Sequence, residues 1–154
     1  MSTPLPVSAT NAGRLKHLEM IQAVIARMAG NGFLIKGWSV TLLSAILALA
    51  VKDRIYAMIW VALVPCLTFW GLDGYFLWQE RAFRRLWDIK SREEQTAPTD
   101  FDMVAKDKRQ HGDTWWRAVW SRTLLAFHGS LLTVVVIVIV GIGTGVLAQP
   151  VAAR

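Results

Sequence analysis

The sequence predicts an all-α membrane protein with three transmembrane helices, and three observations support this fold class. Of the 154 residues, 54% are hydrophobic and only 18% are charged, unlike an ordinary soluble domain. Three stretches contain almost no charged residues: 33–51, 56–78 and 124–148. Each stretch is close to the ~20 residues that a helix needs to cross the hydrocarbon of a bilayer. With so much of the chain in lipid, little room remains for a soluble catalytic core, and an enzyme is not expected.

The first two stretches are predicted to form an antiparallel hairpin, because Lys52, Asp53 and Arg54 supply a short polar turn between them. The third stretch contains a β-branched run from Thr133 to Val140. In lipid this run has to be helical, since a lone strand would leave its backbone groups without hydrogen-bond partners. Residues 149–154 form a tail after it. The sequence therefore predicts a hairpin plus a separate third span.

Two segments are predicted before the first span. Residues 1–11 hold Pro4 and Pro6 among small polar residues and are expected to be disordered. Over 12–30, apolar residues recur at helical spacing, which predicts an amphipathic cytoplasmic helix: Leu18, Ile21, Ile25 and Met28. The run Gly30-Asn31-Gly32 is expected to end it before the membrane. Its apolar face would either lie on lipid headgroups or pair with another copy.

Residues 79–122 are predicted to form a cytoplasmic helical region. The second span is expected to continue as one helix through Lys90, because Glu80 and Arg84 form a favourable i to i+4 pair. A cap at Thr99 or Asp100 predicts a short helix over 101–109. Residues 115–122 would then lead into the third span as an interfacial helix.

The orientation follows from the distribution of Lys and Arg. Fourteen of these residues lie on one side: thirteen precede the first span or lie between the second and third spans, and Lys36 is at the start of the first span. Three lie on the other side. The positive-inside rule then predicts a cytoplasmic amino terminus and an external carboxyl terminus. The net charge of +6 is mostly this bias, so it does not indicate nucleic-acid binding.

Three polar side chains inside the spans are expected to form one layer: Lys36, Asp73 and His128. A carboxylate in hydrocarbon costs several kcal/mol unless it is paired or solvated, so Asp73 needs a partner at its own depth. Lys36 and His128 fall in the same third of the membrane. The layer would lie within one subunit or between subunits, and it would either fix the helix register or act in a gate or ion path.

Small residues follow one face of the first span, at Gly37, Thr41, Ser44 and Ala48. This spacing allows close helix packing, and the same face would line a narrow water-filled path if several copies ringed an axis. The third span carries a Gly-xxx-Gly pair among Gly141, Gly143 and Gly145, which also indicates close packing.

Basic residues cluster just inside the predicted membrane boundary, at Arg81, Arg84 and Arg85, with Lys106, Lys108 and Arg109 further along the loop. They would either contact anionic lipid headgroups or bind a phosphate-bearing ligand, since guanidinium groups suit paired phosphate oxygens. Five tryptophans near the span ends predict an aromatic belt: Trp38, Trp78, Trp115, Trp116 and Trp120.

No catalytic or metal-binding motif is recognisable in the sequence. Cys66 is the only cysteine, and the three histidines lie in three different segments. Neither an intrachain disulfide, a metal site nor a cofactor is therefore expected.

Four groups of residues resemble a family of small bacterial inner-membrane proteins. They are Leu15 to Gln22 with Ile25 to Met28, then Lys36-Gly37-Trp38, then Phe69 to Asp73 with Tyr75, and finally Glu80-Arg81 with Phe83-Arg84. Over residues 14–90 the chain is similar to transmembrane effectors of antiphage systems, in particular those of the Hailong type. The resemblance implies an inner-membrane channel that permeabilises the membrane on infection. It also implies control by a nucleotide or short oligonucleotide made by a partner nucleotidyltransferase.

The combined expectation is a gated ion pathway in the lipid bilayer, formed by a ring of identical subunits such as a tetramer. A single subunit is excluded as the pore, because three helices cannot enclose water while burying their own polar groups. The gate would lie on the first or third span, with the Lys36 and Asp73 layer as the bistable element and the basic residues receiving the ligand. The alternative is a non-conducting adaptor that recruits a cytoplasmic partner protein.

Overall fold

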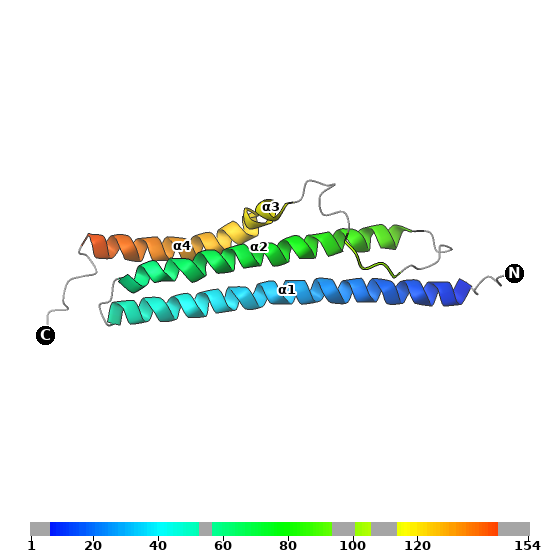
Figure 1. Cartoon of the computed structure of the whole chain (residues 1–154), viewed down its shortest axis with the longest axis horizontal. Helices are drawn as coiled ribbons and strands as arrows, with labels where there is room; N and C mark the ends of the chain where they lie inside the picture. Colours follow the sequence, from blue (N-terminus) through cyan, green and yellow to red (C-terminus); the bar gives the residue numbers. More distant parts are fainter. Residues whose placement is uncertain (1–6, 53–56, 94–100, 106–113, 145–154) are drawn as a thin grey trace.

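The computed structural model describes residues 7–52, 57–93, 101–105 and 114–144. Four helices make up nearly all of them: α1 (Val7–Lys52), α2 (Ala57–Arg92), α3 (Trp115–Val119) and α4 (Arg122–Gly143). α1 and α2 form a long antiparallel pair, and α4 lies along the end of this pair where the α1–α2 turn is (Figure 1). Three helices are long and apolar enough to cross a membrane, which indicates a membrane protein with the predicted hairpin and third helix.

α1 is one uninterrupted helix of 46 residues, about 69 Å at 1.5 Å per residue. The predicted break at Gly30-Asn31-Gly32 is therefore wrong, and the expected cytoplasmic helix and first span are a single element. Glycine costs only about 1 kcal/mol in a helix, which contacts along the whole α1–α2 pair outweigh. The helix already begins at Val7, so the predicted disordered segment does not reach position 11; residues 1–6 lie outside the described part.

α2 has 36 residues and also extends well beyond one membrane thickness. It passes Trp78 without interruption and ends at Arg92, which confirms the predicted continuation through Lys90. Pro65 lies inside the helix. Transmembrane helices tolerate such a proline when neighbouring groups compensate for the lost backbone hydrogen bond.

An apolar core joins the three long helices at the end near the α1–α2 turn. Its buried members come from α1, α2 and α4: Leu43, Ala50, Ile59, Ala62 and Val135. Large apolar side chains such as Trp60, Val64 and Ile137 point outward and are more than half exposed. An apolar exterior around an apolar core is the pattern of a helical bundle surrounded by lipid.

The other ends of α1 and α2 form a two-helix stalk, defined here as residues 11–30 and 76–92. Ile21, Ile25 and Leu86 are buried between the two helices, and Met103 packs against them from the 101–105 segment. This segment has no regular secondary structure, so the short helix predicted over 101–109 is wrong for 101–105. Positions 106–109 are outside the described residues.

α3 is a single short turn of helix that lies on α2 before α4 begins. Thr114 caps it by accepting a hydrogen bond from the Arg117 backbone N–H at 3.4 Å. The backbone leaves helical geometry at Trp120 and Ser121, and α4 starts at Arg122. The predicted interfacial helix over 115–122 is thus interrupted. α4 ends at Gly143, while residues 145–148 of the predicted span fall outside the description.

Gly30→Ala should raise the free energy of unfolding by about 0.5–1 kcal/mol, because alanine stabilises a helix interior over glycine. A Cβ at position 30 meets no atom within 4 Å. Gly32→Ala is the matched control, since its Cβ would lie 3.1 Å from Asp73 Oδ1. SDS-driven unfolding in mixed micelles measures both. A destabilised Gly30→Ala would contradict the continuous helix.

Candidate functional site

Lys36 of α1, Asp73 of α2 and His128 of α4 meet in one charged layer. Lys36 Nζ lies 2.8 Å from Asp73 Oδ1 and 2.6 Å from Oδ2. His128 Nε2 lies 2.9 Å from Oδ2. The contact predicted between these three residues is confirmed, and it forms within one chain. Asp73 is the shared partner, because both basic side chains bind its carboxylate.

The helix lengths give the depth of the layer. Lys36 is sixteen residues from the end of α1, Asp73 sixteen from the start of α2 and His128 fifteen from the end of α4. At 1.5 Å per residue, all three lie about 22–24 Å from the same end of the bundle. In a bilayer whose hydrocarbon is about 30 Å thick and begins at that end, the layer would lie within the hydrocarbon, towards the stalk side.

Burial differs among the three side chains in a way that affects their chemistry. Asp73 is 2% exposed and His128 is fully buried, whereas the Lys36 side chain is 26% exposed. The Lys36 ammonium also lies 6.0 Å from the centre of the Phe127 ring, within range of a cation–π interaction. Removing one partner from a buried ion pair costs about 3–5 kcal/mol, because the other charge is then left buried without a counter-charge.

Aromatic side chains and α3 enclose the layer. The Trp70 ring stacks on His128 with 6.1 Å between the ring centres and an angle of 8°. Trp70 Nε1 donates to the Val119 carbonyl at 3.0 Å, and Trp115 Nε1 donates to the Gly71 carbonyl at 3.0 Å. These two bonds fasten α3 to α2 next to the charged residues.

Two glycines let the backbones approach closely around the layer. A Cβ on Gly32 would lie 3.1 Å from Asp73 Oδ1, so the missing side chain makes room for the carboxylate against α1. A Cβ on Gly74 would lie 3.1 Å from Val119 Cα and even closer to Val119 Cγ2. The sequence patterns did not predict the role of either glycine. Their positions could have indicated it, since Gly32 lies one helical turn before Lys36 and Gly74 adjoins Asp73.

The predicted small-residue face of α1 points away from the bundle. Gly37, Thr41, Ser44 and Ala48 are exposed, while Ile35, Ser39 and Leu43 face α2 and α4. Thr41 Oγ1 donates to the Gly37 carbonyl at 3.0 Å. The face therefore does not pack within the chain. In α4, a Cβ on Gly143 meets no atom within 4 Å, so that glycine is also not used for close packing among the described residues.

The basic cluster on α2 is partly neutralised. Arg84 binds Glu80 through Nη2 at 2.7 Å and Nε at 2.8 Å, which confirms the predicted helical pair. Arg84 also lines an open groove of about 600 Å³ along the stalk, with Leu15, Leu18 and Trp87. Arg81 and Arg85 are half-buried. Lys106, Lys108 and Arg109 lie outside the described residues, so the structure does not place them beside the cluster.

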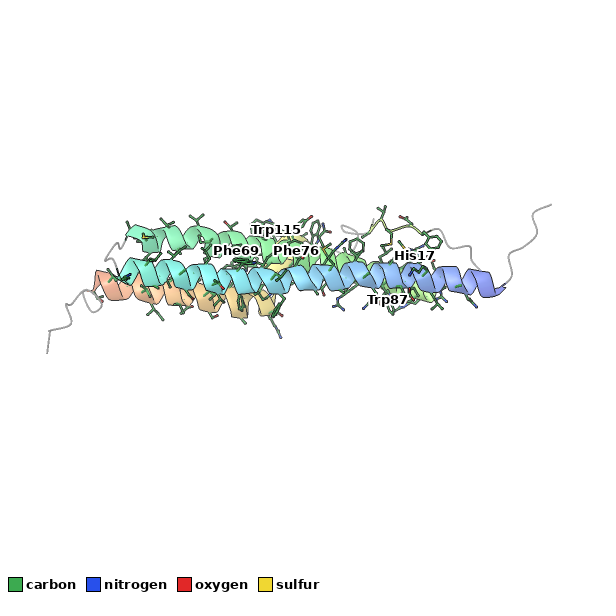
Figure 2. All side chains as sticks on the ribbon, turned by 90° about the horizontal axis from the view of Figure 1, so that it is seen from below. His17, Phe69, Phe76, Trp87 and Trp115 are labelled. Carbon is green, nitrogen blue, oxygen red and sulfur yellow. The ribbon has the colours of Figure 1, made fainter. Side chains whose placement is uncertain are left out.

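His17 is a second buried histidine, which the helical pattern had placed off the apolar face. It is 2% exposed, its Nε2 lies 3.2 Å from the Asp102 carbonyl, and its ring contacts Phe101. Figure 2 shows His17 on the side of the 101–105 segment and Trp87 on the other side of the stalk. No signal in the sequence connects position 17 with a loop 85 residues away.

The tryptophans of the predicted aromatic belt differ in their exposure and their partners. Trp38, Trp116 and Trp120 are more than half exposed, as interfacial rings would be. Trp115 instead bonds to α2, and Trp120 packs edge-on against Trp70 at 5.5 Å. Within the described ranges, no cluster of His, Cys, Asp or Glu has a metal-binding arrangement.

The site thus belongs to a helical membrane protein with an intramembrane ion-paired layer. No protein-family model, curated protein or solved structure matches the chain.

Proposed function

We propose that this chain is the subunit of a homo-oligomeric ion channel in the bacterial inner membrane, with the Lys36, Asp73 and His128 layer as its closing element. The observation that carries the proposal is the buried layer, with Asp73 only 2% exposed at a depth of hydrocarbon. Ionisable groups at such a depth are rare and usually accompany ion movement or gating. Three helices joined through one carboxylate also supply the discrete arrangement that a gate requires.

The proposal requires an oligomer because apolar side chains fill the interior of a single subunit. Apolar side chains occupy the space between α1, α2 and α4 beyond the layer, which leaves no wet path along one subunit's core. The exposed face at Gly37, Thr41 and Ser44 supplies a surface that several copies could turn towards a common axis. In the described arrangement the layer is closed, and conduction belongs to a second arrangement in which α1 is released.

The signal in this proposal is a cytoplasmic nucleotide or short oligonucleotide, received by Arg81, Arg84 and Arg85. The excess of Lys and Arg on the stalk side supports a cytoplasmic stalk. Arg84 is paired with Glu80, so a phosphate group would have to compete with that carboxylate. The resemblance to antiphage effectors supports this choice of ligand.

A non-conducting adaptor is the second candidate, and the stalk groove favours it. The groove is lined by apolar residues together with the charged Glu19, Arg84 and Asp88, which suits an amphipathic helix of a partner protein. In an adaptor, the charged layer would only hold the helices in register.

Ion flux through liposomes containing the purified protein tests the proposal, with the subunit number determined on the same sample. We expect a single homo-oligomeric species whose flux changes when nucleotides or short oligonucleotides are added. Liposomes that stay tight with every ligand, and also with Asp73→Asn, would favour the adaptor.

Arg84→Ala combined with Arg85→Ala should weaken binding of a short oligonucleotide about tenfold or more, since each charge-assisted hydrogen bond contributes about 1.5–3 kcal/mol. Fluorescence anisotropy of a labelled oligonucleotide measures this. Arg92→Ala is the matched control, because Arg92 is exposed on the same helix outside the cluster. If the wild type, the double variant and Arg92→Ala bound the oligonucleotide with equal affinity, Arg84 and Arg85 would not be part of the ligand site.

A further inference from the structure

One carboxylate oxygen serves two basic side chains in the charged layer. Asp73 Oδ2 lies 2.6 Å from Lys36 Nζ and 2.9 Å from His128 Nε2. A single carboxylate carries one negative charge and balances one cation. Two cations at this depth would leave one positive charge in hydrocarbon, which is costly. Lys36 and a charged His128 therefore compete for Asp73.

The hydrogen-bond partners of His128 define its tautomer in the closed layer. Nε2 faces the carboxylate, so a neutral ring must carry its hydrogen on Nε2 to donate to Asp73. Nδ1 then holds a lone pair. In the described part of the chain this atom is buried and has no hydrogen-bond partner, on a residue that is fully buried. An unpartnered acceptor on a histidine is a site for one proton.

We propose that His128 Nδ1 is a proton-binding site inside the membrane and that a proton bound there displaces Lys36 from Asp73. The proton comes from a hydronium ion: an O–H bond of that ion breaks and leaves a water molecule, while the Nδ1 lone pair forms the N–H bond. The resulting imidazolium pairs with Asp73 through Nε2. Lys36 then becomes the second cation on a carboxylate that is already neutralised.

Lys36 is the partner that leaves Asp73, because its ammonium can reach the lipid headgroups. Its side chain is 26% exposed, and a lysine within reach of the interface can extend its ammonium to the headgroups. His128 is held by stacking on Trp70 and by an edge contact with Phe127 at 5.0 Å between ring centres. α4 and α2 thus stay together through the protonated pair while α1 loses its polar contact with them.

The other charged groups near the layer do not share this response. Among the described residues, Lys36 and Asp73 are the charged groups of α1 and α2 that form hydrogen bonds in the layer, and Lys36 Nζ also donates to the Gly32 carbonyl at 3.5 Å. The basic residues nearest in sequence on α3 and α4 are Arg117 and Arg122, and both are exposed. The proton response therefore depends on the three residues of the layer.

Nitrogen NMR of the histidine rings in lipid nanodiscs, between pH 5 and 8, tests the proton site. We expect His128 to have a bare Nδ1 at the alkaline end and to become imidazolium as the pH falls. Lys36→Met should move the His128 midpoint upward by about one pH unit or more, a tenfold gain in proton affinity, because the competing cation is gone. Lys36→Arg should leave it in place, and His17 should not respond to either substitution.

An unchanged midpoint in Lys36→Met, or a hydrogen on Nδ1 at pH 8, would overturn the inference. The consequence of the proton site for conduction rests on the proposed function. Ion flux through liposomes over the same pH range tests the channel separately from the proton site. Flux that rises on acidification and becomes independent of pH in Lys36→Met supports both. If His128 takes up a proton as expected but no flux occurs at any pH, the proposed channel is wrong and the proton site is still supported.

Discussion

Asp73→Asn is expected to lower the free energy of unfolding by about 3 kcal/mol or more, because it leaves the Lys36 ammonium in the membrane without a counter-charge. The asparagine side chain has nearly the same shape, so the loss reports the charge and not the packing. Asp73 is bound by both Lys36 and His128 and is almost fully buried, which leaves no water to replace it. SDS-driven unfolding in mixed micelles, followed by tryptophan fluorescence, measures the change.

A triple variant supplies the control for this expectation. Lys36→Met, Asp73→Leu and His128→Phe together replace the layer with apolar side chains of similar size. Apolar replacement of a complete buried ion pair is often neutral or stabilising, so the triple variant should unfold near or above the wild type. Asp73→Asn within about 0.5 kcal/mol of the wild type would show that the pair is solvated and that the described burial is not maintained in lipid.

Gly74→Leu is expected to have the second large effect, by pushing α3 away from α2. Even a Cβ at position 74 would overlap Val119, which packs in a buried cluster with Trp70 and Leu124. The shift would break the bond from Trp70 to the Val119 carbonyl and the one from Trp115 to the Gly71 carbonyl. Overpacking of this kind costs about 1–3 kcal/mol, before the lost hydrogen bonds.

Tryptophan fluorescence and unfolding report this change, since Trp70 and Trp115 would lose their partners. Gly74→Ala combined with Val119→Ala should recover part of the loss seen in Gly74→Ala alone, because it removes Val119 Cγ2. Gly37→Ala is the matched control: its Cβ meets no atom within 4 Å, so the subunit should keep its stability. If Gly74→Leu behaved like Gly37→Ala, the close contact between α2 and α3 would be wrong.

The three-helix class and the charged layer were predictable from sequence for the same physical reason. Water cannot enter the hydrocarbon, so long apolar stretches have to be helices and a carboxylate such as Asp73 needs a cation at its own depth. Counting residues from the turn between the first two helices then selects Lys36. His128 follows from its distance along the third helix. These arguments need only lengths and charges.

The helix boundaries and the surroundings of the layer depend on packing, which sequence patterns do not encode. Gly30 and Gly32 look like a helix break, yet contacts along α1 and α2 outweigh the glycine cost, and Gly32 instead admits Asp73. Trp115 looks like a belt residue, but its N–H finds the Gly71 carbonyl. Burial of His17 depends on a loop remote in sequence.

If the charged layer keeps the ion pathway closed, breaking the layer releases K⁺ from liposomes. Wild type, Asp73→Asn and the triple apolar variant are reconstituted at equal subunit density. We expect a tight wild type without ligand at neutral pH, a leak through Asp73→Asn, and a tight triple variant that ligand and acid do not open. An inserted, oligomeric Asp73→Asn protein that holds K⁺ as well as the wild type would show that the layer does not close the pathway.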